Sequence, residues 1–375
     1  MGNLFDYLDW RGDLTFGSVP LCALDALALA VLSYVPTAGV VPESAKEEPM
    51  RLSVAASAYF EKTGRSAETD RNHKFLAAAA KTARFGSLRV LAAKQELSRE
   101  RGIQFSAYSV LLPGQSLYVC FEGTDDTLVG WQEDLRMSYE CPVPAQLRAT
   151  EYLNEVAAAY PLRRILVGGH SKGGNLAMYA AINCGPEVRC RIRRVFNFDG
   201  PGFCDGTLSS PAYQELRSRI QSYLPASSIV GVLLEHDTNY RVVKSSAKGL
   251  AQHEPLSWQM MGSDFLYATE RTTFGRRTEA IVRYLDSAFS PERKKLFAKA
   301  LFTVLESTKQ QTVSGIAANK LKSLRNVLRG FKELDPEMVT VLGEALSALS
   351  EANRAVRREE KKQNTRALPS AEKTS

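Results

Sequence analysis

Apolar positions follow two different periods along the chain. Short apolar runs of strand-like character alternate with longer stretches of helical period. The predicted strands are Phe105–Leu112, Ser116–Phe121, Ile165–Val167, Arg194–Phe198 and Ile229–Leu234, the first two joined as a hairpin by Pro113–Gln115. The predicted helices are Leu21–Tyr34, Leu52–Lys62, Arg71–Arg84, Pro144–Tyr160 and Tyr213–Tyr223. This alternation predicts an α/β fold with a mostly parallel central sheet and helices on both faces.

From Pro291 onward the apolar period is helical only, through Phe297–Leu305, Ile316–Leu328 and Met338–Leu349. We therefore expect three parts. Residues 1–290 form the α/β domain, in which 21–84 is a candidate cap over the site. Residues 291–362 form a helical extension, and the polar residues 363–375 form a disordered tail.

The charge of the chain is concentrated in its C-terminal part. The net charge is +7, and residues 291–375 carry 17 Lys and Arg against 10 Asp and Glu, whereas residues 1–290 carry 31 of each sign. A basic extension of this kind could make weak contact with an anionic surface, although solvated helix faces often carry such charge without a partner. No specific nucleic-acid binding is predicted.

The six cysteines are scattered, with no C-x-x-C pair, and several lie in apolar surroundings as buried free thiols do. The N-terminal residues are acidic where a secretion signal would be basic, and the apolar stretch from Val19 to Val35 contains Asp25 and is short for a bilayer span. We therefore expect a cytoplasmic protein that does not span a membrane. No motif points to a metal or an organic cofactor.

The stretch Gly169–Gly173, G-H-S-K-G, carries the strongest chemical signal. It lies between the apolar run Ile165–Val167 and a helical pattern of small residues. A G-x-S-x-G at a strand-to-helix turn is the nucleophile elbow of α/β-hydrolases, in which Gly169, His170 and Gly173 surround the nucleophile Ser171. The helix directs its N-terminal dipole toward the space beside that serine.

A serine nucleophile needs a base and an acid, which follow it in the order serine, acid, histidine in α/β-hydrolases. Of the four histidines, His170 belongs to the elbow and His73 lies upstream, which leaves His236 and His253. His236 directly precedes Asp237 at the end of a predicted strand, whereas His253 lies further on in a loop, so we expect the base to be His253. Asp237 follows the predicted strand Ile229–Leu234 and is the expected acid. Asp199, directly after the predicted strand Arg194–Phe198, is the alternative.

The segments Phe121–Asp126 and Gly130–Leu135 resemble the F-R-G-T…D-W…D-L signature of class 3 lipases, and G-H-S-K-G-G is similar to their elbow. The closer resemblance, over roughly residues 3–262, is to a bacterial lipase-like family of α/β-hydrolases of unknown function. It rests on W-R-G-D-L-x-F, G-T-D-D-T-L-V-G-W and G-H-S-K-G-G-N-L-A.

The resemblance implies an oxyanion hole formed by the backbone N–H groups of Thr124 and Lys172. Asp134 is interpreted as a scaffold residue. Two residues depart from the lipase pattern: Glu122 stands where those lipases have arginine, and Lys172 where they have an apolar residue. The different charge argues against long-chain triglyceride as the substrate.

The sequence thus predicts a serine hydrolase that cleaves a carboxylic ester of a small molecule or lipid through Ser171, His253 and Asp237. A peptidase or thioesterase could use the same residues. The alternative from another functional class is a catalytically inactive binding or regulatory protein that retains the fold. The two classes differ in whether a carboxylate lies within hydrogen-bond reach of His253.

Overall fold

The computed structural model describes the chain except residues 1, 205, 313–329, 332–333 and 367–375. The chain divides into two compact units, Met1–Thr272 and Thr273–Ser375. This division falls before the helix at 273–288, whereas the sequence analysis places the boundary after residue 290.

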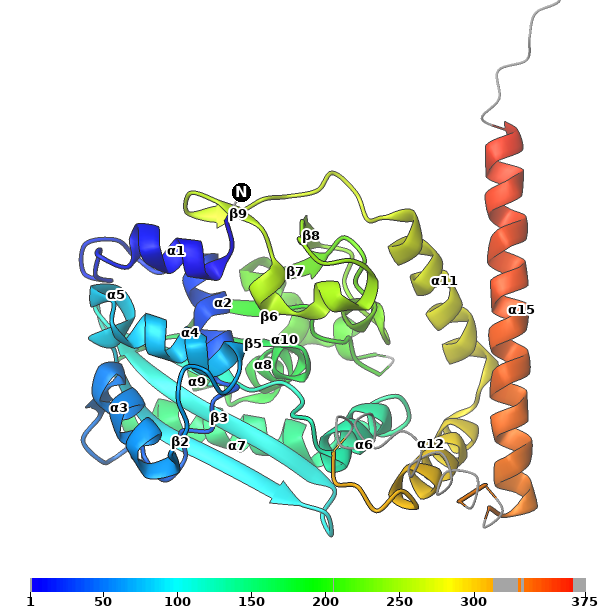
Figure 1. The fold of residues 1–375 in the computed structure, drawn as a ribbon, viewed down its shortest axis with the longest axis horizontal. Helices are drawn as coiled ribbons and strands as arrows, with labels where there is room; N and C mark the ends of the chain where they lie inside the picture. The colour runs from blue at the N-terminus through cyan, green and yellow to red at the C-terminus, as the bar shows by residue number, and fades with distance from the viewer. Residues whose placement is uncertain (1, 205, 313–329, 332–333, 367–375) are drawn as a thin grey trace, which may run out of the picture. The chain divides into compact units, whose positions relative to one another are not determined.

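The first unit is built on one eight-stranded sheet in which the strands lie in chain order (Figure 1). Strands β1 to β4 pair antiparallel and strands β4 to β8 pair parallel. The strands are β1 (Met50–Arg51), β2 (Arg89–Ser98), β3 (Ile103–Leu112), β4 (Ser116–Phe121), β5 (Arg164–His170), β6 (Ile192–Phe198), β7 (Ile220–Pro225) and β8 (Tyr240–Val243). A short hairpin, β9 (Met260–Met261) and β10 (Asp264–Phe265), lies outside this sheet. The expected mostly parallel α/β sheet is confirmed.

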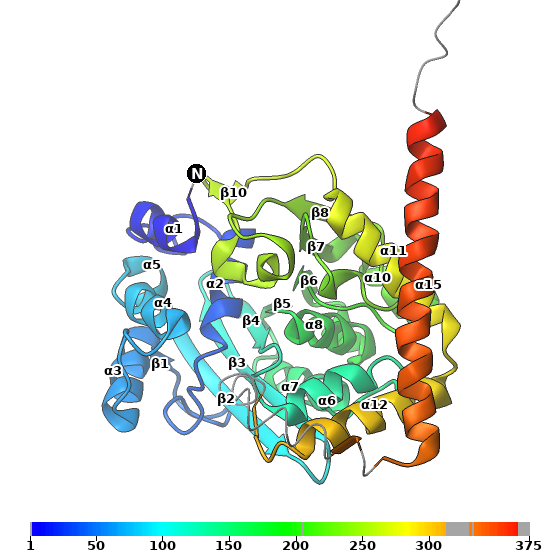
Figure 2. The same ribbon diagram turned by 45° about the vertical axis from the view of Figure 1, so that its right-hand side comes forward.

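Helices cover both faces of the sheet (Figures 1 and 2). On one face α2 (Ala23–Leu32) packs on β4, β5 and β6, and α4 (Arg71–Ala80) packs against α2. On the other face α7 (Pro144–Ala159) and α8 (Lys172–Asn183) pack together, α8 against β4, β5 and β6. The remaining helices of this unit are α1 (Leu4–Arg11), α3 (Leu52–Thr63), α5 (Ala83–Gly86), α6 (Leu128–Arg136), α9 (Pro186–Arg189) and α10 (Pro211–Leu216).

Strand periodicity divides the core between the two faces. Along β4, Tyr118 and Cys120 belong to the apolar cluster under α2, whereas Leu117, Val119 and Phe121 belong to the cluster under α7 and α8. Such alternation follows from the period of two in a strand. Nine of the ten α2 residues are buried, so the segment expected as a candidate cap contributes a core helix.

Sequence periodicity predicts most helices of the first unit but misplaces the strands near residue 225. Tyr213–Tyr223, expected as one helix, is the short helix α10 followed by a 3₁₀ turn and then strand β7. Ile229–Leu234, expected as a strand, contains a 3₁₀ turn at Val230–Val232. Strand β2 was not predicted. An apolar run of four to eight residues does not distinguish a strand from a buried turn.

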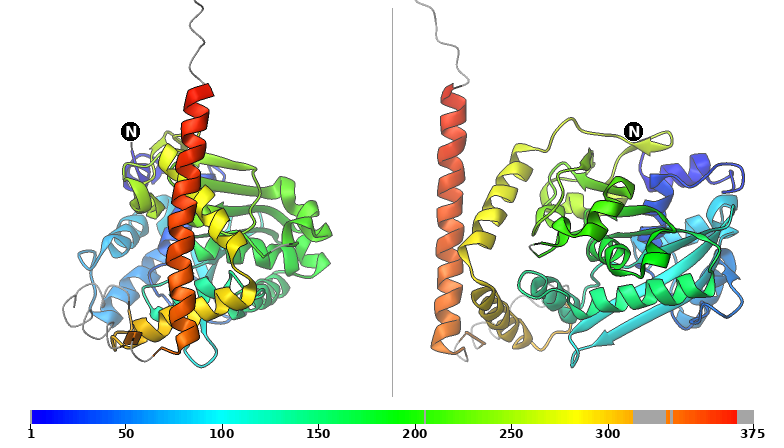
Figure 3. Two further views of the ribbon diagram at one scale, coloured as in Figure 1. Left: turned by 90° about the vertical axis from the view of Figure 1, so that its right-hand side faces the viewer. Right: turned by 180° about the vertical axis from the view of Figure 1, so that it is seen from behind.

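In the second unit α15 (Pro336–Arg366) packs against both α11 (Thr273–Ala288) and α12 (Pro291–Glu306), as Figure 3 shows. The expected helix at 316–328 lies outside the described residues. Of the expected disordered tail, residues 363–366 end α15, and 367–375 lie outside the described residues. No helix in the described part of the chain combines the length and the apolar character needed to cross a membrane.

The register of three parallel strands brings distant residues to one edge of the sheet. Phe121 at the end of β4 lies opposite Gly169 of β5, and His170 of β5 lies opposite Phe198 of β6. The residues that follow these strands therefore emerge side by side at the carboxyl edge, where α/β proteins carry their functional loops. These residues include Thr124, Ser171 and Asp199.

Candidate active site

Ser171 lies in a tight turn between β5 and α8. Its backbone has φ 58° and ψ −132°, a conformation that costs energy for any residue with a side chain. The flanking glycines are required by space, because a Cβ atom on Gly169 would lie 2.4 Å from the backbone of Gly173, and one on Gly173 would lie 2.2 Å from the carbonyl oxygen of Phe121. Strand, turn and helix thus approach closely enough to hold the hydroxyl of Ser171 at the sheet edge.

The imidazole of His253 contacts Ser171. Its Nε2 lies 2.9 Å from Ser171 Oγ, within hydrogen-bond distance. His253 ends a 3₁₀ turn, Gly249–His253, and about 29% of its side chain is exposed. The sequence-predicted pair of serine and histidine is brought together here although 82 positions separate the two residues.

The carboxylate that contacts His253 is Asp199, the residue directly after β6. Its Oδ2 lies 2.7 Å from His253 Nδ1, and its side chain is fully buried. Its other oxygen, Oδ1, accepts hydrogen bonds from the hydroxyl of Ser228 and from the backbone N–H of Gly231 at 3.2 Å. As a carboxylate Asp199 only accepts, so His253 Nδ1 donates and Nε2 is left to accept from Ser171. A hydroxyl and imidazole arranged in this way can act as nucleophile and base.

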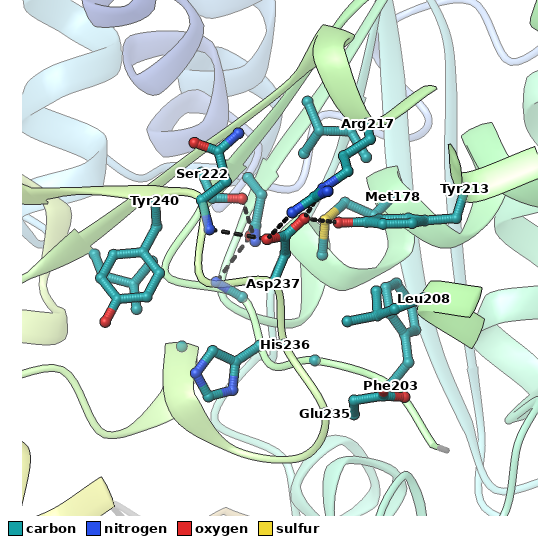
Figure 4. Close-up of a pocket in the computed structure, with 17 residues that line it drawn as sticks. Met178, Phe203, Leu208, Tyr213, Arg217, Ser222, Glu235, His236, Asp237 and Tyr240 are labelled. Carbon is teal, nitrogen blue, oxygen red and sulfur yellow. Dashed lines mark hydrogen bonds and ion pairs between the residues drawn. The ribbon is translucent and has the colours of Figure 1, made fainter. Parts of the chain in front are cut away.

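Asp237, the first-choice acid in the sequence analysis, makes different contacts. Its Oδ2 accepts from Arg217 Nε at 2.7 Å and from the Tyr213 hydroxyl at 2.5 Å, and Figure 4 shows these three side chains together in a pocket. These hydrogen bonds lower the pKa of Asp237 to about 2. The expectation that Asp237 pairs with His253 is therefore corrected to Asp199, because the strand expected before Asp237 is a turn.

A second histidine, His170, holds the backbone of His253 by a hydrogen bond. His170 Nε2 lies 2.8 Å from the backbone carbonyl oxygen of His253, and His170 Nδ1 lies 2.8 Å from the hydroxyl of Tyr34. A carbonyl only accepts, so His170 donates from Nε2 and accepts from Tyr34 at Nδ1. Burial lowers the pKa of His170 well below its ordinary value, and the neighbouring His253 lowers it further. His170 is thus a neutral side chain that orients the backbone of His253.

Thr124 lies next to the turn, in the loop after β4. Its hydroxyl donates to Asp134 Oδ2 at 2.5 Å, so its side chain is held by α6. The preceding Gly123 lies so close to the turn that a Cβ atom there would be 2.7 Å from the carbonyl oxygen of His170. Burial raises the pKa of Asp134 and raises that of Glu122 to about 8. Glu122 in the loop after β4 and Asp134 on α6 are therefore carboxyl groups whose protonation is favoured by burial.

Lys172 is the first residue of α8, so its backbone N–H has no acceptor within the helix. Its side chain is almost completely buried and contacts Gln104 and Glu133. Its Nζ donates to the carbonyl oxygen of Gln104 at 2.7 Å and to Glu133 Oε2 at 3.1 Å. Glu133 is fully buried and also accepts from the backbone N–H of Ala145 at 2.9 Å. The charge of Lys172 is therefore compensated inside the protein.

Neighbouring acids on α6 contact both residues that the resemblance assigns to the oxyanion hole: Glu133 contacts Lys172 and Asp134 contacts Thr124. The sequence analysis did not identify Glu133 or Tyr34 as part of the site. The lysine after the serine would need an acid partner if it were buried, but the sequence does not identify Glu133 as that acid. No signal exists for Tyr34, because a tyrosine at the end of an apolar helix is common in a core.

Comparisons with known proteins give one family and several similar structures. The family model described as Mbeg1-like matches residues 79–303, more than half of the chain. No curated protein matches the sequence. M37 lipase is 15% identical with a TM-score of 0.37, covering 56% of this chain and 70% of that one.

Two fungal lipases have a similar sequence identity and TM-score. The lipase of Rhizomucor miehei in its propeptide complex is 13% identical with a TM-score of 0.34, covering 65% of this chain and 81% of that one. Lipase II from Rhizopus niveus is 13% identical with a TM-score of 0.37, and the match covers 65% of this chain and 86% of that one.

Proposed function

The chain belongs to the Mbeg1-like family, and from this premise and the contacts of Ser171 we propose that it is a serine hydrolase that cleaves a carboxylic ester. One observation carries the proposal: two consecutive hydrogen bonds run from Ser171 Oγ through His253 to the buried carboxylate of Asp199. The presence of a carboxylate beside His253 favours an enzyme over an inactive binding protein with the same fold.

In the proposed reaction Ser171 Oγ attacks the carbonyl carbon of the ester while its proton passes to His253 Nε2. Asp199 keeps the other proton on Nδ1 and stabilises the imidazolium that forms. His253 then gives its proton to the leaving alcohol, and an acyl group remains on Ser171. Water attacks this acyl group by the same proton transfers in reverse, which releases the carboxylic acid and restores the serine.

The negative oxygen that develops during both attacks is assigned to the backbone N–H groups of Thr124 and Lys172. The contact between Thr124 and Asp134, and the anchoring of Lys172 by Glu133, support this assignment because they hold the two residues in place before substrate arrives. Loss of one such donor typically costs about 2.7–4 kcal/mol of transition-state stabilisation.

The burial of Lys172 bears on the choice of substrate. Its ammonium group is paired with Glu133 within the protein, so it does not present a cation to the substrate. This lysine therefore gives no reason to exclude an apolar acyl chain, and the proposed substrate remains an ester of a small molecule or a lipid.

A fluorophosphonate probe tests the proposal directly, because it reacts with an activated serine hydroxyl. We expect labelling of the full-length protein, its loss in Ser171→Ala, and a matching loss in His253→Ala. Ser57→Ala is the control, since Ser57 is an exposed helix residue whose hydroxyl donates to the carbonyl of Ser53. Labelling that persists in Ser171→Ala contradicts the proposal. A series of p-nitrophenyl esters of increasing chain length then measures the acyl preference.

A further inference from the structure

Gln252, the residue before the proposed base, places its side chain against the loop after β7. It is buried and lies in the 3₁₀ turn Gly249–His253. Its Oε1 accepts from the backbone N–H of Ser227 at 2.8 Å, and its Nε2 donates to the carbonyl oxygen of Ala247 at 3.1 Å. Both ends of the buried amide therefore have partners, as buried polar groups require, and one partner belongs to a distant loop.

The same loop holds the proposed acid. Ser228, which follows Ser227, donates from its hydroxyl to Asp199 Oδ1. From Asp199 the contacts run through His253 to Gln252, its neighbour in the chain. From Gln252 they run through Ser227 and Ser228 back to Asp199. Acid and base therefore belong to one closed ring, in which three hydrogen bonds alternate with peptide bonds.

We propose that Gln252 is a positioning residue of the hydrolase, a role that rests on the proposed function. Its side chain fixes the distance between His253 and Asp199, because it anchors the histidine to the loop that holds the acid. Gln252 itself touches no reacting atom. It acts by keeping the imidazole in the orientation in which Nε2 faces Ser171 Oγ.

The anchoring loop is held by further contacts of its own. The backbone N–H of Ala226 donates to the carbonyl oxygen of Val243 at 3.1 Å, and the carbonyl oxygen of Ala226 accepts from the N–H of Thr272 at 2.8 Å. The buried Arg271 donates from Nη2 to the carbonyl oxygen of Ser228 at 2.5 Å. These contacts tie the loop to β8 and to the end of the first unit, so it offers Gln252 a fixed point.

Other hydrogen bonds hold the backbone of the turn but do not involve this loop. The indole Nε1 of the fully buried Trp258 donates to the carbonyl oxygen of Gln252 at 2.8 Å, and His170 donates to that of His253. About 29% of the His253 side chain is exposed, so packing covers only part of its ring. Loss of the Gln252 amide would therefore let the imidazole shift relative to the acid while the turn keeps its place in the fold.

Gln252→Met tests the proposal in the full-length protein, because methionine has the length of glutamine but lacks its amide. We expect the rate of fluorophosphonate labelling to fall about 10²-fold, the loss that a displacement of about 1 Å produces. Gln252→Glu keeps an oxygen that can accept from Ser227 and should recover most of the rate. Tyr152→Phe is the control for lost stability and should label at the unmodified rate. It removes a buried hydroxyl that contacts the carbonyl oxygen of Ala92 at 2.8 Å and Ser109 Oγ at 2.9 Å.

A proton NMR signal reports the contact between His253 and Asp199 itself, which a general loss of stability would not remove from a folded protein. The hydrogen on His253 Nδ1 is shared with a carboxylate and gives a signal far downfield of the amide region, assigned by its absence in His253→Ala. We expect this signal in the unmodified protein and in Tyr152→Phe, and its loss or broadening in Gln252→Met. An unchanged signal in Gln252→Met, or labelling of this variant at the unmodified rate, overturns the proposal.

Hydrogen exchange provides a measurement that needs no variant to fold. In the unmodified protein the Ser227 amide hydrogen should exchange slowly with solvent, because Gln252 accepts it. Exchange at the rate of an unprotected amide overturns the proposal. The failures of the two proposals can also be told apart. Absence of labelling in the unmodified protein contradicts the proposed function, and this inference with it, whereas labelling that requires Ser171 and is unchanged in Gln252→Met contradicts this inference alone.

Discussion

Replacement of Asp199 by asparagine separates the two candidate acids most clearly. The amide has the size of the carboxylate, so the change alters hydrogen bonding with little change in packing. Ser228 and Gly231 both donate to Oδ1 of residue 199, and their hydrogens would hold the amide oxygen at that position. The NH₂ group would then face His253 Nδ1.

This arrangement forces the wrong tautomer on the histidine. Two donors cannot share one hydrogen bond, so His253 would have to accept at Nδ1 and carry its proton on Nε2. Nε2 could then no longer accept the proton of Ser171, which lies 2.9 Å away. The equivalent exchange in Ser-His-Asp enzymes lowers the rate about 10⁴-fold, which corresponds to about 5 kcal/mol of activation free energy.

The assay is the rate of fluorophosphonate labelling, measured for Asp199→Asn and Asp237→Asn under the same conditions. We expect a loss of about 10⁴-fold for Asp199→Asn with a nearly unchanged melting temperature. Asp237→Asn should label at the rate of the unmodified protein, because Asp237 contacts Arg217 and Tyr213. The reasoning is refuted if Asp199→Asn labels within tenfold of the unmodified protein, or if Asp237→Asn loses as much activity.

Three further predictions concern buried polar groups around the turn. Lys172→Met leaves the carboxylate of Glu133 buried without its cation, so the free energy of unfolding measured in urea should fall by about 3–5 kcal/mol. The double variant with Glu133→Gln should regain stability, and a double variant as unstable as Lys172→Met contradicts this reasoning. Glu122, whose pKa is raised from 4.5 to about 8, binds more protons folded than unfolded between these values, so stability falls as pH rises there. Glu122→Gln should therefore gain stability relative to the unmodified protein by up to about 1.4 kcal/mol per pH unit across this window, and a gain independent of pH would disprove the assignment. Tyr34→Phe leaves Nδ1 of His170 buried without its donor at 2.8 Å, which should cost about 1–3 kcal/mol in chemical denaturation; an unchanged free energy of unfolding would show that the hydrogen bond is unimportant.

Patterns of neighbouring residues predict much of the fold. The hairpin of β3 and β4 follows from alternating apolar residues on either side of Pro113–Gln115, and α7 follows from its helical period. Ser171 between two glycines predicts the tight turn, because the close approach of strand and helix excludes side chains at Gly169 and Gly173. In each case residues near one another in sequence are sufficient.

Local patterns do not decide whether Asp199 or Asp237 is the partner of His253. Asp199 and Asp237 both follow apolar runs and both lie between Ser171 and His253 in the chain, so each satisfies the expected order. The run before Asp237 is apolar for another reason, since it contains a 3₁₀ turn in which Gly231 and Val232 are buried and the Gly231 N–H donates to Asp199. The pairing of β6 with β5 places Asp199 beside the turn at Ser171, where its carboxylate contacts His253.

The amino-acid sequence is therefore enough to identify the sheet-and-helix class, the strained turn at Ser171 and the histidine downstream, because these depend on local sterics and on periodicity. The partner of that histidine, and the contact of Lys172 with Glu133, depend on the assembled fold. Each joins groups that are at least 39 positions apart, and strand register and burial bring them together. A local pattern contains no information about which of several distant carboxylates will contact a given side chain in the folded protein.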